Sequence, residues 1–101
     1  MRSTEFKLVL KSHRTASNAF FRIYVLPNAQ QEPRLGLSVA KKINKHACKR
    51  HGIKRIVREW FRLHQAGFPA VDIVIQSRCV YDKTKQKAFW EALYELEKAI
   101  R

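Results

Sequence analysis

The segment from Ala47 to about Ala66 constrains the fold more than any other part of the chain, because its apolar and basic residues fall on opposite sides of one predicted helix. Helical spacing places these apolar residues on one face: Ile53, Ile56, Val57, Trp60, Phe61 and Leu63. The opposite face carries cations and a histidine: Arg50, His51, Lys54, Arg55, Arg58 and Arg62. Such a helix buries its apolar face against a second layer. The segment therefore predicts a helix lying on a sheet, with its basic side in solvent.

The charge of the chain gives the first indication of a partner. The 101 residues contain 21 Lys and Arg against 8 Asp and Glu, a net charge of +13. Between Lys41 and Arg62 there are nine lysines and arginines and one acid, Glu59. Cations of one sign on a helix face repel each other unless a polyanion offsets them. Nucleic acid is the partner we expect first and an anionic membrane surface second, while a merely solvated helix face is the ordinary alternative. A solvated face normally mixes signs, which favours a phosphate-binding face.

The rest of the chain has the patterns of a small mixed fold. The predicted elements are a helix over 3–11 capped by Ser3, strands over 19–27, 34–42 and 70–77, and a final helix over about 83–100. The third strand is apolar almost throughout, which is typical of a strand buried on both faces. The order predicts an α+β fold, an α/β sandwich running helix–strands–helix–strand–helix around one small sheet. We expect one domain over residues 1–101.

The strand over 19–27 carries a candidate stacking surface. Alternation places Phe21, Ile23 and Val25 on one face and Phe20, Arg22 and Tyr24 on the other. Aromatic and basic side chains in alternation bind single-stranded nucleic acid by base stacking and phosphate contact. A helix covering this face would instead make the same aromatics part of the core, and the pattern leaves both possibilities open.

Catalysis by the chain alone is not expected. His46, Cys48 and His51 lie close in sequence, but structural zinc needs four ligands and no second cluster follows. The sequence has neither a nucleophile–base–orienter triple nor clustered carboxylates for two metal ions. Cys48 and Cys79 are expected to be free thiols. No apolar run approaches the roughly 20 residues of a membrane span, and the N-terminus lacks the apolar stretch of a signal peptide, so we expect a cytoplasmic protein.

Two adjoining stretches, "RLGLSVAKK" (34–42) and "HACKRHGIKRIVREWFR" (46–62), form the most specific motif in the chain. They resemble the protein subunit of bacterial ribonuclease P, in which a strand ending Gly-Leu-Ser-Val-Ala-Lys-Lys leads into a helix with the pattern Arg-Asn-Arg-Ile-Lys-Arg-x-x-Arg-Glu. The match continues more loosely through "PAVDIVIQSR" (69–78) and the closing helix. The resemblance implies the α/β sandwich already expected, with a left-handed crossover around the basic helix.

The resemblance also implies a function. In this family a catalytic RNA with bound Mg²⁺ removes the 5′ leader of precursor tRNA, and the small basic protein binds both RNAs without being catalytic. The implied partners are thus the catalytic RNA and precursor tRNA, with no membrane, and we expect the protein alone to be monomeric. Two alternatives remain at this point: a generic RNA-binding module of the ribosomal type, and a helix-turn-helix DNA binder. The second is disfavoured because no short helix is predicted just before the basic one.

Site residues follow by position from the resemblance and from the helix face. The expected RNA-binding residues are Lys41, Lys42, Arg50, His51, Lys54, Arg55, Arg58 and Arg62. The expected residues of the leader-binding cleft are Phe6, Leu10, Phe20, Arg22 and Tyr24. For Phe20, Arg22 and Tyr24 the resemblance shifts the balance from core to function, most of all for Tyr24.

Three features depart from the family pattern. His51 and Gly52 stand where Asn and Arg are usual, and Leu10 stands where a second cleft phenylalanine is common. Glycine inside a helix costs about 1 kcal/mol relative to alanine, so Gly52 either marks an irregular first turn or lets an RNA backbone come close. The chain also begins almost at its first helix, without the Arg-Leu stretch that often precedes it. An upstream start codon or a true truncation would both explain this.

Overall fold

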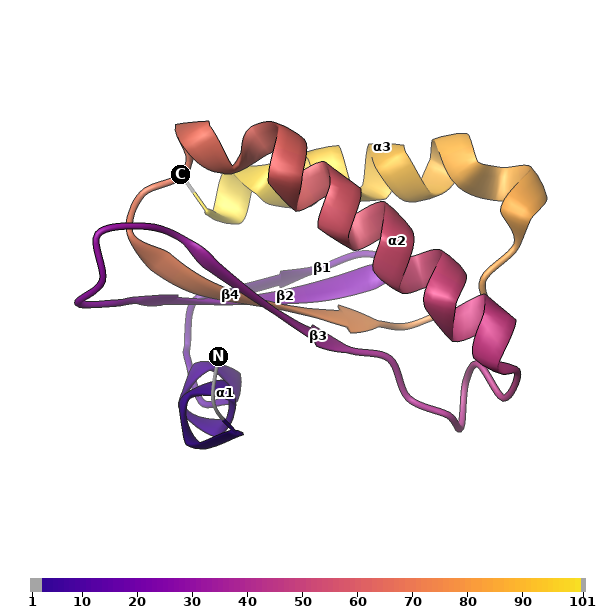
Figure 1. The fold of residues 1–101 in the computed structure, drawn as a ribbon, viewed down its shortest axis with the longest axis horizontal. Coiled ribbons are helices and arrows are strands. Elements are labelled where there is room, and N and C mark those ends of the chain that lie inside the picture. The colour runs from indigo at the N-terminus through magenta and orange to yellow at the C-terminus, as the bar shows by residue number, and fades with distance from the viewer. Residues whose placement is uncertain (1–2, 101) are drawn as a thin grey trace.

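The computed structural model describes residues 3–100, which form a four-stranded sheet with helices on both faces (Figure 1). The elements in chain order are α1 (Ser3–Leu10), β1 (Thr15–Ser17), β2 (Phe21–Pro27), β3 (Arg34–Ser38), α2 (Ala47–His64), β4 (Val71–Ser77) and α3 (Gln86–Leu96). Short 3-10 turns follow α2 and flank α3, at Gln65–Gly67, Lys83–Lys85 and Glu97–Ala99. The α+β sandwich expected from the sequence is confirmed.

The sheet has the strand order β1-β2-β4-β3. Strand β2 is antiparallel to both of its neighbours, and β3 runs parallel to β4. Parallel neighbours need a crossover connection, and here α2 supplies it. The left-handed sense of this crossover stays a prediction. The element before α2 is the strand β3 followed by a loop, which is not the arrangement of a helix-turn-helix.

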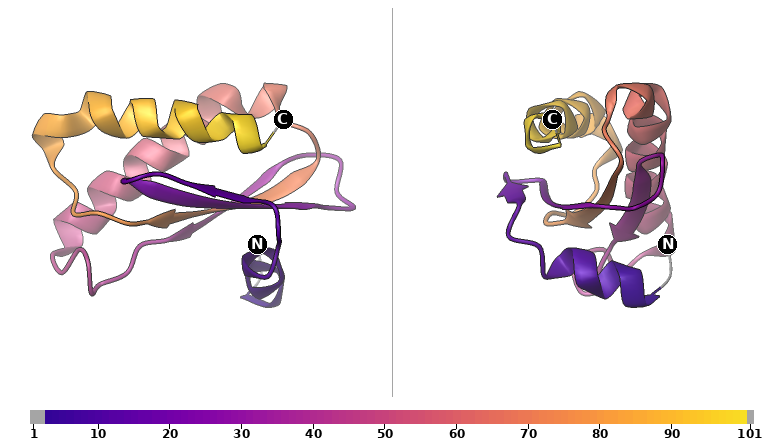
Figure 2. Two further views of the ribbon diagram at one scale, coloured as in Figure 1. Left: turned by 180° about the vertical axis from the view of Figure 1, so that it is seen from behind. Right: turned by 90° about the vertical axis from the view of Figure 1, so that its left-hand side faces the viewer.

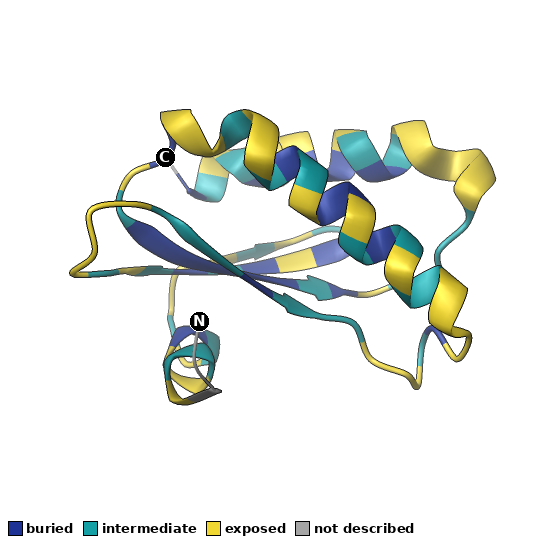
Figure 3. Ribbon diagram, viewed as in Figure 1, coloured by how far each residue is buried: buried dark blue, intermediate teal, exposed yellow. Residues whose placement is uncertain are grey.

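Helices α2 and α3 lie side by side on one face of the sheet, and α1 lies on the other face (Figures 1 and 2). The main core is the layer between the sheet and the helix pair. The sheet contributes alternate residues of β2 and β4, among them Ile23 and Ile75, while α2 and α3 contribute Trp60, Phe89 and Leu93. Figure 3 shows the buried residues of α2 turned toward the sheet and the exposed ones turned outward.

Helix α1 covers part of the opposite sheet face and is anchored at one end of it. Val9 and Val74 are fully buried, although neither belongs to the main core. Since Val74 points away from α2 and α3, α1 is the element that covers it, and α1 contacts both β2 and β4. Beside this contact, Arg34 of β3 bridges Glu5 of α1, at 2.6 Å, and Asp72 of β4, at 2.7 Å. The two ion pairs of Arg34 and the apolar contact of α1 with the sheet together fix the position of α1.

Several predicted boundaries are shifted in the structure. The strand predicted over 34–42 ends at Ser38, and the helix predicted over 83–100 is divided into two 3-10 turns and α3. The strand predicted over 19–27 begins at Phe21, because Asn18 Oδ1 accepts hydrogen bonds from the N–H groups of Phe20 and Phe21 and holds a turn there. Strand β1 was not predicted from the sequence, because it has only three residues. Asp82 caps the turn before α3, its side chain accepting a hydrogen bond from the Thr84 N–H.

Candidate nucleic-acid interface

The outer side of α2 presents a stripe of basic side chains. His51, Arg55, Arg58 and Arg62 are all exposed, and they lie opposite the buried face formed by Ile53, Ile56, Val57 and Trp60. Together with Glu59 the stripe lines a shallow hollow of about 400 Å³. The predicted two-sided helix is therefore confirmed, except that Leu63, expected on the apolar face, is 55% exposed. Leu63 lies in the last turn of α2, at the margin of that face, where it projects past the core.

The cations of the stripe are not equivalent. Arg62 forms an ion pair with Glu59, and the arginine's hydrogen bonds are the main cause of a lowered Glu59 pKa. Within residues 3–100, Arg55 and Arg58 form no ion pair. Their charges are therefore fully available to a polyanion, whereas that of Arg62 is partly offset.

Arg50 has a structural task that its charge alone did not indicate. Its Nη1 donates hydrogen bonds to the main-chain carbonyls of Asn44, at 3.0 Å, and Lys45, at 2.9 Å. These contacts tie the first turn of α2 to the loop that precedes it. Lys41 and Lys42 project from the same loop and are exposed, and Lys54, one turn after Arg50, is half-buried. The predicted basic residues thus form the outer stripe on α2 and a second group at the β3–α2 loop.

A buried asparagine joins this loop to the β4–α3 connection. The side chain of Asn44 is fully buried; its Nδ2 donates to the carbonyl of Cys79 at 3.1 Å, and its Oδ1 accepts from the N–H of Tyr81 at 2.8 Å. One amide therefore satisfies backbone groups that have no partner in a helix or strand. It also places the ring of Tyr81 beside the start of α2. Neither Asn44 nor Tyr81 was predicted from the sequence to have a role at this site.

Gly52 is explained by that ring. A Cβ on residue 52 would overlap the ring of Tyr81, most closely at Cε2, unless the ring moved. The first turn of α2 is regular helix and none of the described glycines has a positive φ, so an irregular first turn is ruled out as the reason. Gly52 is needed because an aromatic ring packs directly on the helix backbone.

The sheet face beside α1 carries the second group of candidate residues. Arg22 and Tyr24 lie on this face, and the guanidinium of Arg22 is 5.2 Å from the centre of the Tyr24 ring. The Tyr24 hydroxyl and Gln76 Oε1 are 3.4 Å apart, and Gln76 stands opposite Arg22 in the strand pairing. Arg22 is exposed and Tyr24 is half-buried, so the two form an accessible aromatic and basic surface.

The expectation that Phe20 shares this face is wrong. Because β2 begins only at Phe21, the alternation does not extend to Phe20. Its ring instead packs edge-on against Phe89 of α3, with centroids 5.0 Å apart, on the far side of the sheet. On α1, Phe6 and Leu10 are both half-buried and stand one turn apart, flanking the buried Val9. They therefore border the sheet face on which Arg22 and Tyr24 lie.

Metal-binding side chains do not gather in the part of the chain that the structure describes. Among residues 3–100 no group of three or more His, Cys, Asp or Glu side chains could hold a metal ion. Cys48 and Cys79 are free thiols, and burial raises the pKa of the Cys79 thiol. None of the described helices is long and apolar enough to cross a bilayer. The fold and these surfaces define a small basic protein built to bind nucleic acid.

Comparison with known proteins assigns the chain to a specific family. A sequence model of the ribonuclease P family matches residues 1–101. The chain is 38% identical over 96 residues to the ribonuclease P protein component of Chromobacterium violaceum, which covers 95% of this chain and 79% of that protein. It is 36% identical over 104 residues to the corresponding protein of Pseudoalteromonas translucida, covering 95% and 74%.

Solved structures agree with this assignment. The RNase P protein of Thermotoga maritima superposes with a TM-score of 0.78 at 30% identity, covering 100% of this chain and 96% of that one. The Staphylococcus aureus RNase P protein gives a TM-score of 0.81 at 27% identity, covering 97% and 90%. The chain belongs to the bacterial ribonuclease P protein family: it is the protein component of a tRNA-processing endoribonuclease that works as a ribonucleoprotein.

Proposed function

We propose that the protein docks on the catalytic RNA through the outer stripe of α2 and holds the 5′ leader of precursor tRNA on the sheet face beside α1. The docking surface comprises His51, Arg55, Arg58 and Arg62 together with Lys41, Lys42, Arg50 and Lys54 around the β3–α2 loop. The leader surface comprises Arg22 and Tyr24, bordered by Phe6 and Leu10. Phe20 is left out because its ring belongs to the core.

The observation that carries this proposal is the separation of two chemically different surfaces by one sheet. The α2 stripe is cationic, so it suits phosphates of a folded RNA and gives a steep dependence on salt. The Arg22–Tyr24 face combines a ring with a guanidinium 5.2 Å from its centre, a combination that suits stacked bases of a single strand. Because the surfaces lie on opposite faces, one protein can contact two RNAs at once.

Hydrolysis itself is assigned to the RNA partner. The described residues, 3–100, offer no cluster that could hold a metal ion, so a Mg²⁺ site made by this chain alone does not fit the side chains present. In this proposal the Mg²⁺ is bound mainly by the RNA, and the protein contributes binding and orientation. Arg50 donates only from Nη1 to the loop carbonyls, and its other N–H groups would face the RNA. A cytoplasmic location, where precursor tRNA is processed, follows from the same proposal.

The central test is cleavage of precursor tRNA by a bacterial ribonuclease P RNA at low Mg²⁺, with and without this protein. The protein should restore accurate release of the 5′ leader. If it binds the RNA tightly and restores no cleavage, the proposed role is wrong and the chain is an RNA-binding protein of another kind.

Tyr24→Ala tests the leader surface. We expect weaker binding of precursor tRNA and little change for mature tRNA, since only the precursor has a leader to stack on the ring. Tyr94→Ala, which removes an exposed tyrosine from α3 on the other side of the sheet, is the matched control. Equal losses on both tRNAs would favour generic RNA binding.

A further inference from the structure

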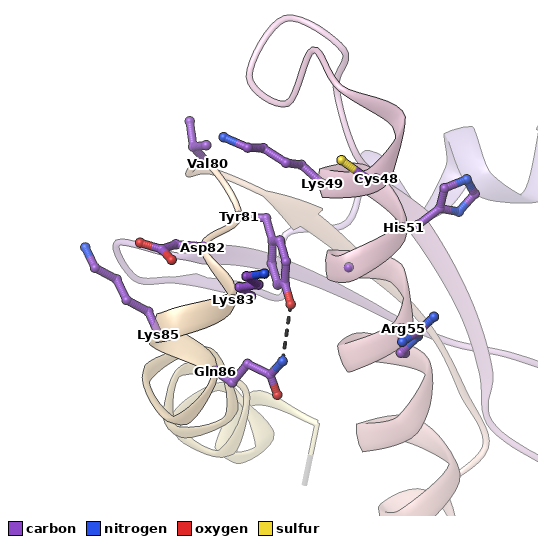
Figure 4. A pocket seen from close by; sticks show the side chains of 11 residues that line it. Cys48, Lys49, His51, Arg55, Val80, Tyr81, Asp82, Lys83, Lys85 and Gln86 are labelled. Carbon is purple, nitrogen blue, oxygen red and sulfur yellow. Dashed lines mark hydrogen bonds between the residues drawn. The ribbon is translucent and has the colours of Figure 1, made fainter.

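A second hollow lies beside the α2 stripe. It is a groove of about 1130 Å³ between the first half of α2 and the segment from Val80 to Gln86 (Figure 4). Four of its lining side chains are cations: Lys49 and Arg55 from α2, and Lys83 and Lys85 from the turn before α3. A single carboxylate, that of Asp82, also lines it.

The cations of the groove are available to a ligand. Within residues 3–100 none of the four forms an ion pair, and Asp82 is committed to the turn, accepting from both the N–H and the hydroxyl of Thr84. The pKa of Asp82 is lowered, first by those hydrogen bonds and then by the charges of Lys85 and Lys49. Lys49 from one wall and Lys85 from the other line the same groove as this carboxylate.

The groove also has a floor that a base or sugar can contact. Tyr81 stands between the two walls, and its hydroxyl accepts a hydrogen bond from Gln86 Nε2 at 3.3 Å (Figure 4). Its ring packs against Gly52 and against Phe89, with ring centroids 5.6 Å apart in the second case, and Asn44 anchors its main-chain N–H. A rigid aromatic floor between rows of cations is the arrangement that binds single-stranded RNA.

The groove and the α2 stripe are continuous. His51 and Arg55 line both the groove and the shallow hollow that extends to Arg58 and Arg62. A strand of RNA could therefore follow one track of cations from the turn before α3 to the end of α2. The track lies on the helix side of the sheet, away from the Arg22–Tyr24 face, so the leader is not its natural occupant.

We propose that this groove binds an unpaired segment of the catalytic RNA, with its phosphates on Lys49, Lys83 and Lys85 and a nucleotide against Tyr81. The inference rests on the proposed function and adds the 3-10 turn before α3, Lys83–Lys85, to the docking surface. It makes Lys83 and Lys85 determinants of RNA affinity, although they lie about 20 residues beyond the basic helix in sequence.

The first experiment compares two double variants with equal loss of charge, by binding to a bacterial ribonuclease P RNA over a range of salt. Lys83→Ala with Lys85→Ala should weaken binding and reduce the salt slope by about one unit per lysine. Lys87→Ala with Lys98→Ala, two exposed lysines of the same C-terminal region outside the groove, should change both quantities much less. Equal effects of the two pairs, or no effect of the first, would overturn the inference.

The second experiment uses the native thiol in the groove. Cys48 is exposed and lines the groove, so its rate of alkylation reports whether the groove is covered. The catalytic RNA should slow that rate several-fold, and a single-stranded leader oligonucleotide should not. Protection by the leader alone, or by neither RNA, would overturn the inference. The proposed function is tested separately, because binding of the catalytic RNA and restored cleavage are measured on the wild-type protein.

Discussion

The indole N–H of Trp60 donates a hydrogen bond of 2.7 Å to Glu97 Oε1, and this bond joins the last turns of α2 to the end of α3. Trp60 is fully buried, and Glu97 is also 3.5 Å from His64 Nδ1. The contact therefore connects the two helices at the end farther from the groove. It is a charge-assisted hydrogen bond on the edge of the core, where such bonds are stronger than neutral ones.

Trp60→Phe should lower the free energy of unfolding by about 2 kcal/mol, because it removes this donor and part of a buried ring. Urea denaturation measures the change. Trp90→Phe is the matched control, since the half-buried Trp90 forms no such hydrogen bond among the described residues. Equal losses would show that the indole–carboxylate bond contributes little.

Gly52→Ala should destabilise the protein although alanine is the better helix former. The new Cβ would meet the Tyr81 ring, and overpacking of this kind costs about 1–3 kcal/mol. The loss is measured by thermal denaturation. In a Tyr81→Ala background the same substitution should become stabilising, by about 1 kcal/mol, because only helix propensity is left.

A destabilising effect of equal size in both backgrounds would show that Tyr81 is not the reason for the glycine.

The contact between Gly52 and Tyr81 also predicts that Gly52→Arg, which restores the charge usual in the family, displaces Tyr81. We expect this variant to be less stable and to lose protection of Cys48 by the RNA. A gain in RNA affinity with unchanged stability would contradict the structure here.

Asp72 should make the free energy of unfolding depend on pH in the acidic range. Burial of its carboxylate by itself raises the pKa, but the hydrogen bonds from Arg34 and Asn28, together with nearby positive charge, outweigh burial, so the pKa is lowered from its usual 3.8. A group with a lowered pKa in the folded state stabilises above its unfolded pKa, and that contribution is lost as the pH falls through the folded pKa. Asp72→Asn should therefore be less stable than wild type at pH 7, and the difference should shrink below the usual pKa.

Measuring unfolding at neutral and strongly acidic pH checks this expectation. Asp82→Asn is the comparison, because that carboxylate also has a lowered pKa but lies at the surface with Thr84 as its main partner. If the difference in unfolding free energy between wild type and Asp72→Asn does not change with pH, the effect comes from the altered shape of the side chain and not from its charge.

Arg58→Ala should lower the salt slope of RNA binding more than Arg62→Ala does. Arg58 has no ion pair among the described residues, whereas Arg62 already interacts with Glu59. An unpaired cation that meets a phosphate contributes about one unit of slope, and a paired one contributes less. Titrating salt in a filter-binding assay gives both slopes. Equal reductions would mean that Glu59 releases Arg62 when RNA binds.

The sequence predicted the elements whose patterns are long and one-sided. The period of α2 predicted which residues face the core, apart from Leu63, and the apolar run of β4 predicted burial on both of its faces. The sequence could not predict that Arg50 holds a loop or that Asn44 links two connections, because both depend on backbone groups brought together by the fold. Gly52 was recognised as unusual, but its reason lies at Tyr81, which no local pattern connects to it.

The pleat of β2 places neighbouring side chains on opposite faces of the sheet. Ile23 lies in the core beneath the helices, and Tyr24 lies on the opposite face. Substitution at either position disturbs one surface at a time. Insertion or deletion of one residue would exchange the faces along the rest of the strand, placing an apolar chain in solvent and a tyrosine in the core. Evolution can therefore change the composition of this strand far more freely than its length.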